Sequence, residues 1–206
     1  MGKKKFIKEY LEPIVIAVLI ALFIRTFIVQ AFKIPSSSME PTLLVGDHLL
    51  VSKFIYGVKF PFTDTKLFQY KSPKRGDIIV FIYPRDRSKD FIKRVIATEG
   101  EKVEVVRNKI SIDDKVIDDP WGYYHEEGSW TKYLQPMEKF GPVVVPKDCL
   151  FVMGDNRDNS QDSRFWGFVN TNAVRGKALI IYFSWDHYAR DLLGKIRWMR
   201  FGKLIH

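Results

Sequence analysis

The sequence has a single cysteine and lacks the motifs of several common enzyme classes. Cys149 is the only cysteine among 206 residues, so no disulfide can form within the chain. It lies in an apolar run, which predicts a small buried side chain rather than a nucleophile. The metal-binding patterns C-x-x-C and H-E-x-x-H are both absent. The sequence therefore gives no support for a metal site, and it predicts no cofactor.

Signatures of nucleotide binding and of common hydrolases are also missing. The chain contains no G-x-S-x-G, no G-x-G-x-x-G and no phosphate-binding G-x-x-x-x-G-K. An S-x-x-K match occurs over Ser129–Lys132, but no K-T-G accompanies it, and a loop rich in glycine and proline surrounds it. We interpret this match as chance.

Positive charge is in excess, with a net charge of +9, but it is concentrated at the two ends of the chain. Residues 1–33 carry six basic and two acidic side chains, and residues 187–206 carry five basic and one acidic. Residues 34–186 hold 22 basic and 21 acidic groups. Because both basic ends adjoin apolar sequence, the pattern favours a phospholipid membrane over nucleic acid as a partner.

The longest apolar run, Ile14–Phe32, follows four lysines. As a helix it would rise about 28 Å, close to the ~30 Å hydrocarbon core of a bilayer. Arg25 lies seven residues before its end, near enough for the side chain to reach toward an interface. The run is longer than the usual apolar part of a signal peptide, and no A-x-A site follows it, which predicts an uncleaved anchor. The basic flank should stay in the cytoplasm, so everything after Phe32 should lie outside it.

Most of the remaining chain has the pattern of short β-strands, rich in β-branched and aromatic residues and separated by turn residues. Arg107 and Asn108 are placed to turn a hairpin. An antiparallel β-barrel or sandwich behind one transmembrane helix is therefore the expected fold, which is mainly β. The expected strands are Leu49–Phe54, Asp77–Tyr83, Phe91–Thr98, Lys102–Val106, Lys109–Ile112, Val143–Val145, Cys149–Met153 and Ala178–Phe183.

Three segments are expected in the chain as a whole. Residues 1–33 form the cytoplasmic flank and the anchor, and residues 34–186 form a catalytic domain with a variable insertion at about 104–142. Within the domain, Gly57–Arg75 and Asp118–Pro142 have the composition of loops. Residues 187–206 form a basic, amphipathic tail, expected as a short helix that either lies on the membrane or packs against the domain.

Two segments hold most of the polar groups that could carry chemistry. Ile34–Leu43 places three consecutive serines between two prolines directly after the anchor, and Met153–Gly167 follows an expected strand with many hydrogen-bonding side chains. By composition alone the first would be a linker and the second a polar loop. Loops on rigid β-scaffolds nevertheless often carry function.

These segments and their order along the chain resemble bacterial type I signal peptidases, the serine peptidases that mature exported proteins. The resemblance covers nearly the whole chain behind the anchor. Five blocks carry it, namely Pro35–Thr42, Gly46–Phe54, Arg75–Phe81, Ile92–Ile96 and Gly154–Gly167. Each block alone is weak evidence, but the ordered set is specific.

The resemblance implies roles for eight side chains. Ser38 would be the nucleophile and Lys93 its general base. Ser36 would assist the backbone N–H of Ser38 in an oxyanion hole, and Ser160 would orient the lysine. The side chains expected to brace the site are Asp155, Arg157, Asp162 and Arg164.

Elementary chemistry is compatible with a Ser/Lys dyad. A serine hydroxyl needs a base, and a lysine can serve only when it is neutral. Since the ordinary pKa of lysine is about 10.4, work near neutral pH requires burial that lowers it by roughly 2–3 units. A strand over Phe91–Ile96 would place Phe91 and Val95 on the same face as Lys93. Without the resemblance, an exposed lysine on an edge strand would be the simpler interpretation.

The resemblance implies removal of signal peptides from exported preproteins, without metal or cofactor, at the outer face of the cytoplasmic membrane near the secretion machinery. Ser38 lies six residues beyond Phe32, so it should lie within about 20 Å of the end of the expected span. Two alternatives remain open from the sequence. One is a processing peptidase of the same family dedicated to a single substrate, and the other is a non-enzymatic anchored β-domain that binds peptides.

Overall fold

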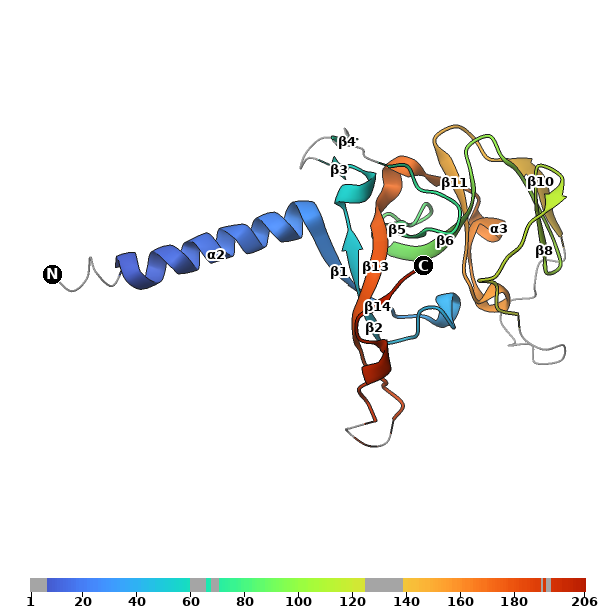
Figure 1. Ribbon diagram of the computed structural model, residues 1–206. Coiled ribbons are helices and arrows are strands. Elements are labelled where there is room, and N and C mark those ends of the chain that lie inside the picture. Colours follow the sequence, from blue (N-terminus) through green and yellow to red (C-terminus); the bar gives the residue numbers. More distant parts are fainter. Residues whose placement is uncertain (1–6, 60–65, 68–70, 125–138, 190, 192–193) are drawn as a thin grey trace.

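The structure, a computed structural model, describes residues 7–59, 66–67, 71–124, 139–189, 191 and 194–206. It begins with a helix that projects away from a β-rich domain (Figure 1). The π-helical turn η1 (Ile7–Leu11) leads into α2 (Glu12–Phe23), and a second π-helical turn, η2 (Ile24–Ile28), continues it. The stretch Lys8–Ile28 has a mean hydropathy of 2.3 and buries nothing against the domain. Its length and composition are those of a helix that can cross a membrane.

The apolar helix begins and ends earlier than the sequence predicted. Val29–Lys33 forms strand β1, which pairs with the domain, so the expectation that the helix continues to Phe32 was wrong. The β-branched Val29 and the alternating burial of β1 are compatible with a strand once a neighbouring strand is available. Lys53 Nζ donates to the carbonyls of Arg25 and Thr26, 3.3 Å away in each case, and so satisfies acceptors at the last turn of the helix.

The main sheet has eight strands, and its hydrogen-bonded path is β1-β2-β13-β5-β6-β11-β12, with β14 paired to β13. All of its pairings are antiparallel, which confirms the predicted class as mainly β. Within the described residues the path does not close on itself into a barrel. Besides β1, its strands are β2 (Asp47–Ser52), β5 (Ile78–Ile82), β6 (Asp90–Thr98), β11 (Cys149–Met153), β12 (Val169–Asn170), β13 (Val174–Ser184) and β14 (Lys203–Leu204).

A second, four-stranded sheet with the order β10-β7-β8-β9 lies beside the far end of the main sheet from the helix (Figure 1). As predicted, Arg107 and Asn108 turn the β7–β8 hairpin, and Arg107 takes a positive φ of 52°. The strands are β7 (Lys102–Val106), β8 (Lys109–Ile112), β9 (Lys115–Val116) and β10 (Lys139–Val144).

The two segments expected as loops are only partly described. β3 (Val58–Lys59) and β4 (Lys66–Leu67) form a small two-stranded sheet inside the first one, after the 3-10 turn η4 (Phe54–Tyr56). In the second segment, residues 125–138, and with them the S-x-x-K match, lie outside the described residues.

Three buried apolar clusters hold the domain together, and one of them joins distant parts of the chain. Met39 and Leu43 belong to the same cluster as Ile78 of β5, Ile181 of β13 and Ile205 near the end of the chain. Burying such side chains contributes about 1.5–3 kcal/mol each. The segment after the anchor is therefore fixed by core packing and is not a linker.

Cys149, at the start of β11, is half-buried, whereas the sequence predicted a fully buried side chain. It packs against the apolar cluster around Phe151. Burial raises the pKa of its thiol, which argues against a reactive thiolate.

The tail differs from the predicted short helix. Its described part contains the 3-10 turn η7 (Trp198–Arg200) and the strand β14, whose residue Leu204 pairs with Ile180 of β13. Pairing with an open strand satisfies backbone groups that a short helix would have left free at its ends, which explains why the tail adopts this form.

Candidate active site

Ser38 lies in the short 3-10 turn η3 (Ser37–Met39), directly after β1. Buried apolar residues on both sides fix this turn, because Ile34 and Met39 expose 2% and 0% of their surface. The Ile34 N–H also donates to the Asp47 carbonyl at 2.8 Å, which joins the turn to the start of β2. Ser38 itself is 9% exposed. The packing therefore holds a largely buried serine in a fixed position on a rigid scaffold.

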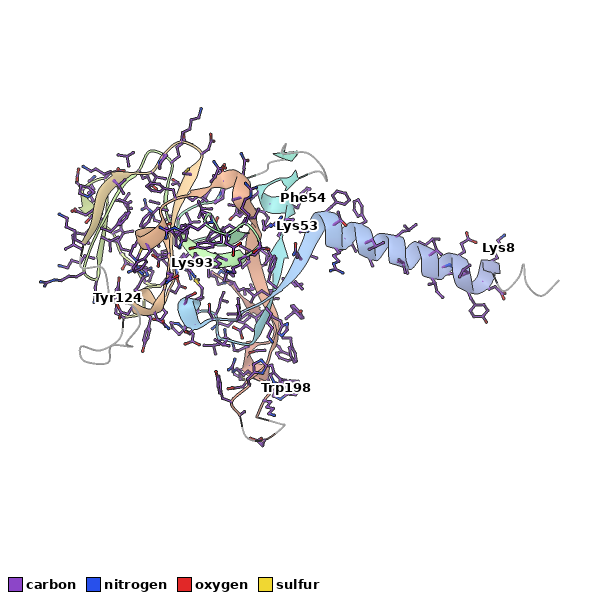
Figure 2. The ribbon with its side chains drawn as sticks, turned by 180° about the vertical axis from the view of Figure 1, so that it is seen from behind. Lys8, Lys53, Phe54, Lys93, Tyr124 and Trp198 are labelled. Carbon is purple, nitrogen blue, oxygen red and sulfur yellow. The ribbon has the colours of Figure 1, made fainter. Side chains whose placement is uncertain are left out.

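Lys93 lies on β6, which is an interior strand between β5 and β11. It pairs in register with Ile79 and is only 4% exposed, so the alternative of an exposed lysine on an edge strand was wrong. Figure 2 shows Lys93 in the middle of the β-domain, far from Lys8 at the start of the helix. As the strand pattern predicted, Phe91 is close to the amine, with its ring centroid 5.6 Å from Nζ.

The structure brings these two side chains together. Lys93 Nζ donates to Ser38 Oγ at 2.7 Å and to the Ile92 carbonyl at 3.1 Å. This separation lies within the range expected of a nucleophile and its base.

Burial lowers the pKa of Lys93 from 10.5 to about 8. Loss of solvation is the main cause, since a charged ammonium is costly away from water. Asp162 and Asp155 act in the opposite direction, and Arg164 adds to the lowering. The amine is therefore neutral in about a tenth of the molecules at pH 7 and in about half of them at pH 8, and the neutral form is the one that can act as a base.

The two other serines with implied roles differ in exposure. Ser36 is exposed, and its Oγ lies 3.4 Å from Ser38 Oγ. Ser160 is 1% exposed, and its Oγ finds no hydrogen-bond partner among the described residues. A buried hydroxyl without a partner costs about 1–3 kcal/mol. Its role in orienting the lysine remains a prediction.

Two asparagines and a glycine, which the sequence did not single out, hold the serine turn. The backbone N–H of Asn156 donates to the Ser38 carbonyl at 3.2 Å, and Asn159 Nδ2 donates to Ser37 Oγ at 2.9 Å. A Cβ at Gly154 would lie 2.4 Å from the Ser38 carbonyl oxygen, so this close approach requires glycine. All three residues lie inside the polar segment Met153–Gly167. The polar composition of that segment is the sequence feature that could have indicated them.

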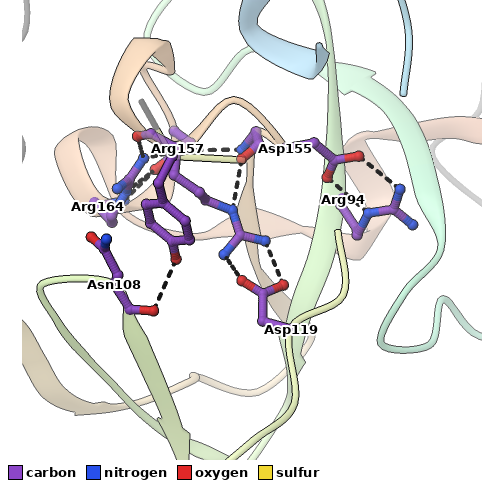
Figure 3. Close-up of polar contacts among 9 residues, drawn as sticks. Arg94, Asn108, Asp119, Asp155, Arg157 and Arg164 are labelled. Atoms are coloured by element: carbon purple, nitrogen blue, oxygen red, sulfur yellow. Dashed lines mark hydrogen bonds and ion pairs between the residues drawn. The ribbon is translucent and has the colours of Figure 1, made fainter. Parts of the chain in front are cut away.

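Buried ion pairs brace this part of the fold, and Figure 3 shows those of Arg94 with Asp155 and of Arg157 with Asp119. Asp155 receives two hydrogen bonds from Arg94, at 2.8 and 2.7 Å, and both side chains are fully buried. Arg164 Nε and Nη2 bind the two carboxylate oxygens of Asp162 at 2.8 and 2.9 Å. Such two-pronged pairs are strong and directional.

The third pair joins Arg157 to Asp119. Arg157 Nε also donates to the Gly154 carbonyl at 3.0 Å, so the pair braces the glycine that contacts the serine turn. The sequence indicated the arginines and aspartates of the polar segment but missed their partners Asp119 and Arg94. Trp121 was also missed, and its ring lies 4.7 Å from the Arg94 guanidinium.

An open cavity of about 430 Å³ adjoins the Ser38–Lys93 contact. Its lining combines three apolar residues with six polar or charged ones. The lining residues are Pro35, Ser36, Ser38, Asp90, Phe91, Ile92, Lys93, Asn159 and Gln161. A carbonyl carbon bound there could reach Ser38 Oγ, so the geometry is suited to acyl transfer.

Metal ligands are not grouped in the part of the chain that the structure describes, since no cluster of three or more His, Cys, Asp or Glu side chains occurs in it.

Comparison with known proteins agrees with this chemistry. The profile of the family described as "Signal peptidase, peptidase S26" matches residues 7–185. Signal peptidase I of Aquifex aeolicus is 36% identical to this chain, and the match covers 86% of this chain and 84% of the relative. Signal peptidase I of Pseudomonas aeruginosa is 33% identical, and the match covers 90% of this chain and 75% of the relative. A solved signal peptidase I from Enterococcus faecalis is 30% identical with a TM-score of 0.42, over 52% of this chain and 97% of that chain. Since the match extends from the anchor helix to the end of β13, the chain belongs to the signal peptidase family, peptidase S26.

Proposed function

We propose that the protein is a signal peptidase I, which removes N-terminal signal peptides from exported preproteins with Ser38 as nucleophile and Lys93 as general base. The observation that carries the proposal is the 2.7 Å contact between Lys93 Nζ and Ser38 Oγ at the edge of an open cavity. Family membership and the names of the relatives support the substrate class.

Acylation starts from neutral Lys93. The amine accepts the Ser38 hydroxyl proton while Oγ forms a bond to the scissile carbonyl carbon. The oxyanion of the tetrahedral intermediate is bound by the backbone N–H of Ser38 and by the Ser36 hydroxyl. When the C–N bond breaks, the Lys93 ammonium returns its proton to the leaving amine. The mature protein departs, and the signal peptide remains as an ester on Ser38.

Deacylation repeats these steps with water. Neutral Lys93 takes a proton from a water molecule, whose oxygen attacks the ester carbonyl, and the Ser38 alkoxide regains the proton as the ester breaks. We assign the orienting of Lys93 to the buried hydroxyl of Ser160. The ion pairs of Asp155, Arg157, Asp162 and Arg164 hold the polar segment rigid around the dyad.

The placement at the membrane is part of the proposal. Lys8–Ile28 spans the cytoplasmic membrane once, with the N-terminus in the cytoplasm and residues 34–186 outside as the catalytic domain, near the secretion machinery. Ten residues separate Ile28 from Ser38, which limits their distance to about 35 Å. Trp198 and Met199 in the tail expose 61% and 95% of their surface, which supports contact of residues 187–206 with lipid. Figure 2 shows Trp198 on a part of the tail that extends away from the domain.

The proposal is tested by cleavage of a preprotein by the full chain in detergent or vesicles. Ser38→Ala and Lys93→Ala should each abolish cleavage while leaving the far-UV circular dichroism unchanged, and Ser88→Ala, an exposed serine, is the matched control. Normal turnover by either dyad variant would overturn the assignment. A panel of preproteins separates a general enzyme from one dedicated to a single substrate, which would cleave only one member of the panel.

A further inference from the structure

The C-terminal tail returns to the centre of the fold after leaving β13 (Figure 1). Four of its residues contact the segments that carry the proposed dyad. We call Arg197, Arg200, Ile205 and His206 the C-terminal strap. They are at least 104 residues from Lys93 and 159 residues from Ser38 in the sequence.

Arg200 binds the segment between Thr42 and Asp47, which follows the proposed nucleophile Ser38. Its Nε donates to Asp47 Oδ1 at 2.9 Å, and its Nη2 donates to Asp47 Oδ2 at 2.5 Å and to the Thr42 carbonyl at 3.0 Å. Asp47 is fully buried and also accepts from Ser184 Oγ at 2.7 Å and from the Leu44 N–H at 2.8 Å. A buried, two-pronged pair of this kind fixes direction as well as distance.

A second arginine of the strap holds the same segment. Arg197 Nη1 donates to the Val45 carbonyl at 2.9 Å and also lies 3.4 Å from Ser184 Oγ. The strap thus contacts three backbone or carboxylate positions between Thr42 and Asp47, the stretch that connects the Ser38 turn to β2.

The end of the chain contacts the base strand. The backbone oxygen of His206 accepts from Arg94 Nη1 at 2.8 Å, and Arg94 is the sequence neighbour of Lys93. Ile205 is 8% exposed and belongs to the same apolar cluster as Met39, the residue after Ser38. Ile92, the other neighbour of Lys93, packs against that cluster. One short segment is therefore in contact with the surroundings of both dyad residues.

We propose that the C-terminal strap positions the dyad, with Arg200 as a positioning residue that holds the Ser38 turn against the Lys93 strand. This inference rests on the proposed function, because it assumes that Ser38 and Lys93 are the dyad. It explains how the Ser38 turn and the Lys93 strand, which are distant in sequence, keep the two side chains within hydrogen-bonding distance. Loosening the strap should lengthen the Oγ–Nζ distance and admit water to the amine. Turnover should then fall, since a misplacement of about 1 Å in an active site can cost about 100-fold in rate.

The test compares Arg200→Gln with Lys203→Gln in the full chain. Lys203 is an exposed cation of the same tail and lies outside the strap. We expect Arg200→Gln to lower kcat for a preprotein by about tenfold or more, with KM within about twofold of the unsubstituted chain. Lys203→Gln should leave both constants unchanged.

The pH dependence of kcat provides a second measurement. A variant that is only less stable should keep the same pH profile where it is folded. Water reaching Lys93 would raise its pKa, so the half-maximal pH of kcat should move upward in Arg200→Gln. The charged groups facing the amine are Asp155, Asp162 and Arg164, with Asp90 in the same cavity, and none of them is altered by the substitution.

The outcomes separate the two proposals. Arg200→Gln could lower the melting temperature and leave kcat, KM and the pH profile unchanged at temperatures where the variant is folded. That result would show that Arg200 only stabilises the fold, and it would overturn the proposal that the strap positions the dyad. Loss of cleavage in Ser38→Ala together with that result would leave the proposed function intact. If Arg200→Gln does not fold, Arg200→Lys, which keeps the charge but loses the two-pronged geometry, is measured in the same way. It should show the same fall in kcat at smaller size, and an unchanged kcat would again overturn the strap.

Discussion

Lys93 Nζ lies 2.7 Å from Ser38 Oγ although 55 residues separate the two in the sequence. Ser38 lies in the turn η3 that follows β1, and three strands, β2, β13 and β5, lie between β1 and β6 in the sheet path. Their contact is therefore a product of tertiary packing across the domain, and it should respond to changes that leave both side chains in place.

The rate of cleavage should rise with pH through the pKa of Lys93. The amine must be neutral to act as a base, and burial lowers its pKa to about 8. Below that value the neutral fraction falls about tenfold per pH unit, so kcat/KM should fall with a slope near one, and it should level off above it. Initial rates on one preprotein over a pH series measure this.

A rate that is flat below pH 8 would contradict Lys93 as the titrating base. Asp86→Asn, which neutralises a partly exposed carboxylate in the turn between β5 and β6, should leave the profile unchanged.

Lys93→Met should stabilise the fold while abolishing cleavage. Because the folded-state pKa of Lys93 is below its ordinary value, the unfolded chain binds more protons between about pH 8 and 10.5, and the penalty is fully present below pH 8. A shift of this size is worth about 3 kcal/mol, and the lost hydrogen bond to Ser38 offsets about 1 kcal/mol of it. Denaturant unfolding near pH 7 should show a gain of about 2 kcal/mol that shrinks as the pH approaches 10.5.

The matched control is Lys147→Met, an exposed lysine, which should change stability by less than about 0.5 kcal/mol. A destabilised Lys93→Met variant would mean that the amine is a net contributor to folding.

Arg94→Met should be strongly destabilising because it leaves the buried Asp155 carboxylate without its cation. Both side chains of this pair are fully buried, and removing one partner of such a pair costs about 3–5 kcal/mol. The exposed pair between Lys102 and Asp114 provides the contrast, and Lys102→Met should cost less than about 1 kcal/mol. Equal losses in urea unfolding of the two variants would show that burial of the Arg94 pair does not matter.

Much of the fold could be predicted because its strands follow local rules. The boundaries of β7, β8 and β11 agree with the expected ones, and each combines β-branched residues with turn residues at its ends. The short strands β3, β4, β9, β12 and β14 were missed, because two-residue pairings depend on the neighbouring strand and leave almost no local pattern.

The candidate site was predicted unevenly for a physical reason. Residues of the polar segment could be named because they are adjacent in sequence, whereas their partners Asp119 and Arg94 come from two distant stretches. The end of the helix was misplaced for the same reason. Nothing in an apolar run shows that its last four residues, Val29–Phe32, will meet β2 and form a strand.

Gly154→Ala should disable the site with little change elsewhere. A Cβ at this position would lie 2.2 Å from Ser160 Oγ and 2.4 Å from the Ser38 carbonyl oxygen, both well inside van der Waals contact. Rotation of the Ser160 hydroxyl would relieve only the Oγ contact, because Ser160 Cβ would still lie 2.6 Å away. The Ser38 contact is with backbone, so the serine turn itself must shift. We expect kcat for a preprotein to fall by about 100-fold, since the turn carries the nucleophile.

The matched control is Gly100→Ala, where a Cβ would meet nothing within 4 Å and only the positive φ of 81° adds a cost, about 1 kcal/mol of stability. Adding Ser160→Gly to Gly154→Ala should not restore turnover, because the clash with the Ser38 carbonyl remains. A Gly154→Ala variant with normal kcat would show that the turn adjusts without moving Ser38 Oγ from Lys93.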